Sequence, residues 1–163
     1  MQQGFMLFEL MVALCLILFC SGLGFMAYSS HNGTSFTRNA ALISLLFQTA
    51  STRAHCLKKE QIIIFNPHDA TIFFDNQRYE LSDGYRFQVL PDTYGPPSAP
   101  HKLVTHPITF SENRARVHPD GTLQAGTLYI THGNRQYALT TPVSAFSHIR
   151  VYRYTQNVWQ KYW

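Results

Sequence analysis

The pattern of hydrophobic positions divides the chain into two parts. Residues 5–28 are almost entirely apolar and include a single charged side chain, Glu9. A helix of this length is roughly 36 Å long, more than the hydrocarbon core of a bilayer at about 30 Å. The four residues before it, Met1 to Gly4, contain no Lys or Arg, and no A-x-A-like cleavage site follows the run. These features favour a retained membrane anchor over a cleaved secretory signal peptide.

A second helical pattern follows a short polar stretch. In residues 39–61 apolar side chains recur every three or four positions, which predicts an amphipathic helix. Asn32-Gly33, within residues 29–37, is a turn signal. We therefore expect one long rod with a break near residues 29–37, hydrophobic in its first half and amphipathic in its second.

From residue 62 onward the pattern changes to short runs of β-forming residues separated by turn signals. Residues 91–107 contain five prolines and are predicted to form a loop. The sequence thus predicts an α+β fold, in which a long N-terminal hydrophobic helix (membrane anchor plus amphipathic half) packs on antiparallel β-sheets. The predicted strands are 62–65, 71–75, 78–81, 85–90, 108–110, 115–117, 127–131, 136–140 and 149–154, of which the first four form a meander.

The composition limits the classes of function. Apolar residues make up 45% of the chain and aromatic residues 14%, which is enough for a packed core and excludes a wholly disordered protein. Three cysteines exclude a small disulfide scaffold. There are eight histidines, but no His-Glu-x-x-His, Cys-x-x-Cys, Gly-rich phosphate loop or Gly-x-Ser-x-Gly motif. We therefore expect a protein that is not an enzyme and that holds no cofactor and no metal.

Residues 4–12 read Gly-Phe-Met-Leu-Phe-Glu-Leu-Met-Val. This segment resembles the processing site of type IV pilins and type II secretion pseudopilins. The resemblance implies cleavage after Gly4 by a prepilin peptidase and N-methylation of Phe5. It also implies that Glu9 sets the axial register of a filament by meeting the N-terminal amine of a neighbouring subunit. The implied regions are a prepilin leader (1–4), a transmembrane and filament-core helix (5–28), a linker with an amphipathic helix (29–61) and a periplasmic β-rich domain (62–163).

Four segments of the second half carry a further resemblance. Residues 81–84 (Leu-Ser-Asp-Gly), 108–110, 118–122 (His-Pro-Asp-Gly-Thr) and 126–130 are similar, in this order, to the GspH/FimT family of minor pilins and pseudopilins. The resemblance implies a minor pseudopilin, a structural subunit of the type II secretion pseudopilus that takes part in protein secretion across the outer membrane. It also implies a single-pass protein of the bacterial inner membrane with its C-terminal domain in the periplasm. The implied partners are other pseudopilins or minor pilins, the prepilin peptidase and the inner-membrane assembly platform.

The basic character of the chain, which has a net charge of +4, is concentrated in its last third. Residues 114–163 contain six basic side chains and one acid, with aromatic residues between them. The pattern is typical of a solvated strand face over core aromatics, or of a surface that contacts phosphates and stacks on bases. Some FimT-like pilins bind DNA through a C-terminal Gly-Arg-x-Arg motif, and the matching segment here is residues 147–150. The resemblance thus implies an alternative function, DNA binding in natural transformation or the priming of pilus assembly, with Arg150, Arg153 and Arg135 as DNA contacts. A third hypothesis is an unprocessed single-span periplasmic protein of unrelated role.

Overall fold

The structure is a computed structural model that describes residues 3–82, 84–95, 99, 101–142 and 149–162. Within the N-terminal helix, the side chains of residues 3–10, 15–16 and 18–34 lie outside this description. The chain divides into two compact units, Met1–Thr37 and Arg38–Trp163. The first is helical, and the second contains the rest of the same helix together with the strands described below.

α1 (Gln3–Leu57) is one continuous helix that contributes to both units. The break expected near residues 29–37 does not occur in its backbone, and Asn32-Gly33 lies inside the helix. A Gly in a helix interior is only about 1 kcal/mol less favourable than Ala, so this local turn signal does not outweigh the helical hydrogen bonds around it. α1 ends in a Schellman motif, in which Lys58 adopts a φ of 51° and the N–H of Lys59 donates to the carbonyl of Ala54 at 3.3 Å.

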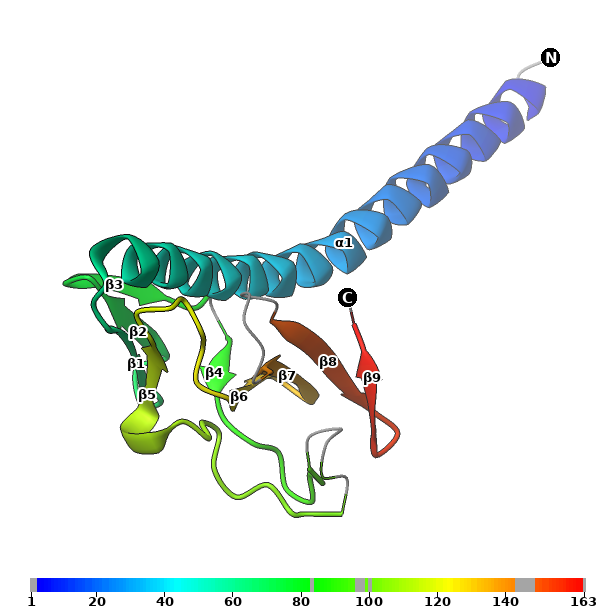
Figure 1. The fold of residues 1–163 in the computed structure, drawn as a ribbon. Coiled ribbons are helices and arrows are strands. Elements are labelled where there is room, and N and C mark those ends of the chain that lie inside the picture. Colours follow the sequence, from blue (N-terminus) through cyan, green and yellow to red (C-terminus); the bar gives the residue numbers. More distant parts are fainter. Residues whose placement is uncertain (1–2, 83, 96–98, 100, 143–148, 163) are drawn as a thin grey trace. The chain divides into compact units, whose positions relative to one another are not determined.

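Two antiparallel sheets make up the rest of the second unit (Figure 1). Sheet A has the strand order β3-β2-β1-β5, and sheet B has the order β4-β6-β7-β8-β9. The fourth strand therefore leaves the expected meander and pairs with β6, whereas β5 returns to pair with β1. The bounds are β1 (Gln61–Asn66), β2 (Thr71–Phe74), β3 (Gln77–Glu80), β4 (Arg86–Phe87), the 3-10 helix η1 (Ser111–Asn113), β5 (Arg114–Val117), β6 (Gly126–His132), β7 (Arg135–Thr141), β8 (Arg150–Thr155) and β9 (Val158–Lys161).

The core of the second unit is built around four phenylalanine rings. The ring centroid of Phe47 in α1 lies 6.3 Å from that of Phe65 in β1 and 6.2 Å from that of Phe110. Phe65 also contacts Phe87 of β4, at 5.9 Å, so the cluster joins α1 to both sheets. Full burial of each such side chain contributes about 1.5–3 kcal/mol. The cluster is surrounded by other buried side chains, which include Ile43, Ile63, Ile72, Val117, Leu128, Ile130, Leu139 and Val151.

Two expectations from the sequence are wrong. Across the residues that the structure describes, no helix is long and apolar enough to cross a membrane, so neither a membrane-anchor half of the helix nor a single-pass inner-membrane location is supported. The fold is mostly β-sheet, with two antiparallel sheets and one long helix, and not a pilin-like α+β fold with a hydrophobic anchor.

Candidate functional site

The residues implied in processing and register lie at the start of α1. Gly4, Phe5 and Glu9 belong to the first turns of the helix, and their side chains lie outside the described part of the chain. Met1 and Gln2, the first residues of the implied leader, also lie outside it. Their roles in cleavage, methylation and register therefore stay predictions of the sequence.

The next turn of α1 presents apolar side chains to solvent. Met11 is 59% exposed, Leu14 is 52% exposed, and Val12 between them is exposed as well. Successive residues of an α-helix are rotated by about 100°, so these three side chains point in different directions. The described part of the N-terminal unit thus carries exposed apolar side chains on more than one side of the helix.

The arginines implied in DNA contact lie on two faces of sheet B. Arg150 and Arg153 are three positions apart in β8, and successive strand residues point to opposite faces. Arg153 is opposite Tyr137 of β7, and Arg135 lies two residues before Tyr137, so Arg135 and Arg153 are on the same face of the sheet. Arg150 is on the other face with Tyr152, whose partner across the strands is Lys161. The fold therefore brings Arg150 together with Lys161 and separates it from Arg153.

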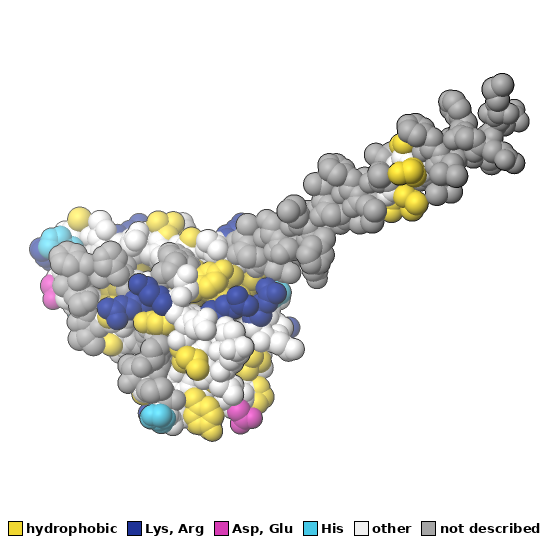
Figure 2. All heavy atoms as spheres, turned by 90° about the vertical axis from the view of Figure 1, so that its right-hand side faces the viewer, with side chains coloured by type: hydrophobic (Ala, Val, Ile, Leu, Met, Phe, Trp, Pro, Cys, Tyr) yellow, Lys and Arg dark blue, Asp and Glu magenta, His cyan; other side chains and the backbone are white. Residues whose placement is uncertain are grey.

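The basic side chains on this side of the molecule are dispersed. Figure 2 faces the side on which β8 and β9 lie in Figure 1, and it shows Lys and Arg side chains in two groups with apolar atoms between them. Residues 147–148, the first half of the segment matched to the DNA-binding motif, lie outside the described part of the chain. The described residues thus provide cations next to aromatic rings, but on separate surfaces.

The proline-rich loop packs against the outer face of sheet B. The buried side chain of Gln136 accepts two hydrogen bonds at Oε1, from the N–H of Leu90 at 3.1 Å and from the hydroxyl of Thr93 at 2.8 Å. The indole Nε1–H of Trp159 donates to the carbonyl of Tyr94 at 2.7 Å. These bonds fix the described part of the loop at three points along two strands.

Tyr129 lies buried under this cover. Its ring centroid is 5.8 Å from that of Trp159, and Tyr94 and Leu103 close the loop beside them as an isolated β-bridge. Burial disfavours the charged phenolate, and this raises the pKa of Tyr129 to about 12. The loop and the aromatic side chains of β8 and β9 thus form a second, smaller packing layer of sheet B.

The two turn motifs of the GspH/FimT resemblance are held by α1. In residues 81–84 the N–H and the hydroxyl of Ser82 both donate to Oδ1 of the buried Asn39, each at 2.9 Å; Asp83 lies outside the described residues. In residues 118–122 the carbonyl of Gly121 accepts a hydrogen bond of 2.7 Å from the hydroxyl of Ser51. Both motifs therefore serve the attachment of α1 to the sheets.

Asp120 closes the second of these turns. Its Oδ1 accepts hydrogen bonds from the hydroxyl of Thr122 at 2.7 Å and from the N–H of Thr122 at 2.9 Å. These bonds favour the carboxylate, and they hold the pKa of Asp120 below its usual value. The next residue, Gly121, has a φ of 86°, which suits a residue without Cβ. The motif is thus explained by turn geometry.

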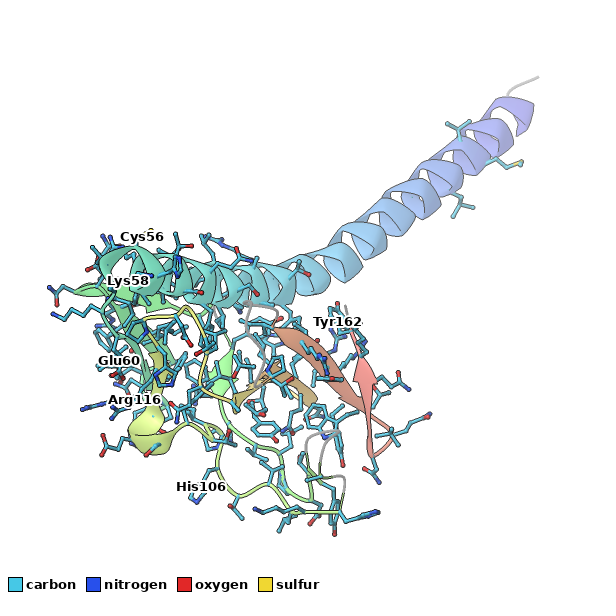
Figure 3. All side chains as sticks on the ribbon, viewed as in Figure 1. Cys56, Lys58, Glu60, His106, Arg116 and Tyr162 are labelled. Atoms are coloured by element: carbon cyan, nitrogen blue, oxygen red, sulfur yellow. The ribbon has the colours of Figure 1, made fainter. Side chains whose placement is uncertain are left out.

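One surface was missed by the sequence analysis, the outer face of sheet A. Ile62, Ile64 and Phe73 are 38–40% exposed there, although they lie in the middle of the sheet. The signal was present in the sequence, because the run of residues 62–65 is continuously apolar, whereas a strand with one solvated face normally alternates. Figure 3 shows two charged residues of this region, Glu60 and Arg116, close together and well separated from Tyr162 at the other sheet.

Neither a metal site among the described residues nor a match to other proteins guides the assignment further. Within the described residues, no group of three or more His, Cys, Asp or Glu side chains is placed to hold a metal ion. His132 stacks on Tyr85, with ring centroids 4.5 Å apart. Comparison of the chain with protein-family models, with curated proteins and with solved structures gives no match. The resemblance to pilins and pseudopilins therefore rests on the motifs of the sequence.

Proposed function

We propose that this protein is a structural subunit of the pseudopilin class, a minor pseudopilin of a type II secretion system that takes part in protein secretion. Its role is to assemble with other subunits through α1, and it catalyses no reaction. The observation that carries the proposal is the N-terminal unit, whose described part is a helix with exposed Met11, Val12 and Leu14. Apolar side chains of this kind favour association, at about 25 cal/mol per Å² of surface covered.

The division of α1 between two units supports this role. From Arg38 onward the helix is fixed to the sheets, through Phe47 and through the hydrogen bonds of Asn39 and Ser51. A filament subunit needs such a division, with one part that holds a folded domain and one part that packs against other subunits. Gly4, Phe5 and Glu9 then lie at the assembling end, where the implied processing and register contacts would occur.

The intact mass of the protein isolated from its own host tests the proposal. We expect a mass that lacks Met1–Gly4 and carries one additional methyl group. A Gly4→Leu variant, which blocks the implied cleavage site, should retain its full mass. An unprocessed mass for the natural chain, in cells that contain a prepilin peptidase, would contradict the proposal.

Glu9 provides a second test. In Glu9→Gln the side chain keeps its shape but loses the charge that would meet an N-terminal amine. Incorporation into filaments should therefore fall by about tenfold, which corresponds to a loss of about 1.4 kcal/mol in the free energy of association. Ala13→Ser changes an exposed helix position in the same unit and serves as the matched control. Equal incorporation of the Glu9→Gln protein and the natural chain would contradict the proposed role of Glu9 in setting the axial register.

DNA binding is a second candidate because Arg150, Tyr152 and Lys161 lie together on one face of sheet B. If this surface binds DNA, Arg150→Ala should weaken binding to single-stranded DNA and reduce its salt dependence, since a phosphate contact is lost. Arg153→Ala, on the opposite face, should have little effect. Equal effects of the two variants, or no binding at low ionic strength, would exclude this surface as the DNA site.

A further inference from the structure

The outer face of sheet A combines an apolar centre with a charged rim. The strand register places Ile64 of β1 opposite Phe73 of β2 and Arg114 of β5, and it places Ile62 opposite Arg116. Phe73 is in turn opposite Arg78 of β3. Paired residues of antiparallel strands point to the same face. We call these six side chains the sheet A outer face; they are Ile62, Ile64, Phe73, Arg78, Arg114 and Arg116.

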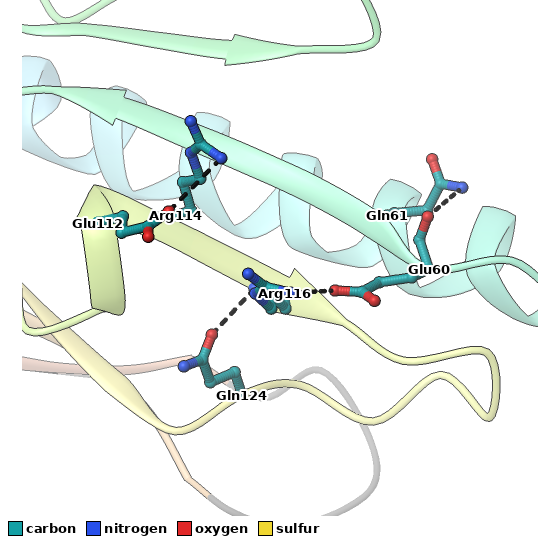
Figure 4. A network of polar contacts seen from close by, with 6 residues as sticks. All are labelled: Glu60, Gln61, Glu112, Arg114, Arg116 and Gln124. Carbon is teal, nitrogen blue, oxygen red and sulfur yellow. Dashed lines mark hydrogen bonds and ion pairs between the residues drawn. The ribbon is translucent and has the colours of Figure 1, made fainter.

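α1 does not cover this face. Phe65, the neighbour of Ile64 in β1, points to the opposite side of the sheet and packs on Phe47 of α1. Figure 4 looks onto the outer face and shows the helix behind β1 and β5, with Arg114 and Arg116 in front. The apolar side chains at the centre are therefore exposed on the solvated side of the sheet, where a strand position is usually polar.

Each arginine of the rim has an acidic neighbour. Arg78 lies 2.9 Å from Glu80, Arg114 lies 3.5 Å from Glu112 and Arg116 lies 3.4 Å from Glu60. These pairs are exposed, so each contributes little to stability. Their consequence is electrostatic: the three arginines of the face and their three glutamate neighbours together carry no net charge, whereas the chain as a whole has a net charge of +4.

From these observations we propose that the sheet A outer face is an interface between two copies of this chain. Copies that carry a net positive charge repel each other through their basic surfaces, and they approach most easily through a neutral one. In a two-fold contact the same patch meets itself, so the arginines of one copy can reach the glutamates of the other around the apolar centre. An acidic partner would instead be drawn to the surfaces around β8 and β9, where Arg150 and Lys161 have no acidic residue within their strands.

The size of the face predicts a weak dimer. Strands lie about 4.8 Å apart and rise about 3.3 Å per residue, so four strands of this length present about 300 Å². A stable interface buries about 800 Å² on each partner. We therefore expect weak association, which other contacts between subunits would reinforce. This proposal is independent of the pseudopilin assignment, because it does not involve residues 1–37.

Site-specific photo-crosslinking of the full-length chain tests the proposal. A photoreactive phenylalanine analogue replaces Ile64, and the purified chain is irradiated at about 100 μM as a mixture of copies with and without isotope labelling. We expect crosslinked dimers that combine a labelled and an unlabelled copy, with the second attachment point in β1, β2 or β5. The analogue placed at Gln48, an exposed position of α1, serves as the control for contacts made through the helix.

A charge in the apolar centre should abolish the contact. Phe73→Lys adds a positive charge to each copy and should lower the crosslinking yield at position 64 at least fivefold. Tyr94→Lys makes the same change at an exposed aromatic residue of the sheet B loop and should leave the yield unchanged. Far-ultraviolet circular dichroism verifies that both variants are folded.

The outcomes separate this proposal from the proposed function. The dimer would be overturned if position 64 gave no crosslinks or if its crosslinks mapped outside sheet A. Crosslinks that persist in Phe73→Lys would overturn it as well. The same crosslinks in a Glu9→Gln background should be unchanged, because the interface does not use α1. Loss of the crosslinks in Glu9→Gln would mean that position 64 only reports filament assembly, and this too would overturn the proposal.

Discussion

The two sheets of this protein use their outer faces in different ways. In β1 of sheet A, exposed residues alternate with the buried Ile63 and Phe65, so one face packs on α1 and the other meets solvent. In β6 of sheet B the five central residues, from Thr127 to Thr131, are all buried. Sheet B is covered on its inner face by the phenylalanine core and on its outer face by the proline-rich loop.

The difference shows that a loop can act as a layer of the core. The loop has little regular structure, but it places Leu90, Thr93 and Tyr94 over β7 and β9 through hydrogen bonds to side chains of the sheet. Within the described residues sheet A has no such cover, and its outer residues Ile62, Ile64 and Phe73 stay exposed. Mutations on the two faces of each sheet should therefore have unequal effects on sheet A and similar effects on sheet B.

The largest effect is expected in the core of sheet A. Phe65→Ala removes a ring that packs on Phe47, Phe87 and Phe110, and it should lower the free energy of unfolding by about 3–5 kcal/mol. Phe73→Ala, on the outer face of the same sheet, should change it by less than about 1 kcal/mol because the ring is already exposed. Chemical denaturation of both variants measures the difference. Equal losses would mean that the outer face is part of the core.

Gln136 tests whether the loop is a structural layer of sheet B. In Gln136→Leu the N–H of Leu90 and the hydroxyl of Thr93 lose a buried acceptor, so the free energy of unfolding should fall by about 1–3 kcal/mol. Gln124→Leu is the matched control in the region of sheet A, since the side chain of Gln124 accepts an exposed hydrogen bond from the N–H of Arg116. Hydrogen exchange should be faster around residues 90–95 in the first variant alone. Unchanged exchange there would show that the loop is held by other contacts.

The buried Tyr129 predicts a loss of stability at alkaline pH. An unfolded tyrosine ionises near pH 10, whereas the folded state retains the proton of Tyr129 up to about pH 12. The unfolded state therefore releases a proton first, and the stability that is full below pH 10 declines as the pH rises toward 12. At pH 11 the natural chain should have lost about 1.4 kcal/mol relative to Tyr129→Phe, which lacks the ionisable group.

Urea denaturation between pH 8 and pH 11 measures this difference. Tyr94→Phe, at an exposed tyrosine of the loop, should follow the natural chain over the whole range. A parallel pH dependence of Tyr129→Phe and the natural chain would show that water reaches the phenol beneath the loop.

The sequence predicted the strands of both sheets better than their arrangement. The runs of residues 62–65 and 136–140 lie within β1 and β7, because β-branched and aromatic side chains mark them clearly. The pairing of β4 with β6 and of β5 with β1 depends on contacts between distant residues, such as Phe65 with Phe87, which no local pattern records. β9 was missed because its hairpin turn is Gln156-Asn157, with φ values of 52° and 62° and no glycine to signal it.

For the candidate sites, the sequence could predict which residues share a face only within a single strand, where side chains alternate with a period of two. A period of two places Arg150 and Arg153 on opposite faces of a strand, although the resemblance to the DNA-binding motif grouped them as contacts. The pairing of Arg150 with Lys161 required the missed strand β9. The outer face of sheet A required the register of four strands, since its arginines come from β3 and β5, at opposite edges.

The smallest effect on the free energy of unfolding is expected from the loss of a single exposed hydrogen bond, and one such bond on each sheet can be compared. Trp159→Phe keeps an aromatic ring beside Tyr154 but removes the bond of 2.7 Å from the indole N–H to the carbonyl of Tyr94. Tyr79→Phe on sheet A removes a bond of 2.6 Å from its hydroxyl to Oε1 of Gln77, two residues away in the same strand. The first bond joins segments far apart in the chain and should contribute about 0.5–1 kcal/mol, whereas the second should contribute almost nothing.

The rate of proteolytic cleavage in the loop measures the difference between these two variants. If the loop is a layer of sheet B, Trp159→Phe should increase cleavage after Lys102 about threefold, because the loop opens more often when one of its attachments is lost. Tyr79→Phe should leave the cleavage rate at its natural value. An increase in both variants would instead indicate a general loss of stability. The hydroxyl of Tyr154 in β8 also accepts a hydrogen bond of 3.3 Å from the N–H of Tyr94. No increase in either variant would show that Gln136 and Tyr154 suffice to hold the loop, in which case the second packing layer is centred on β7 and β8, and β9 only borders it.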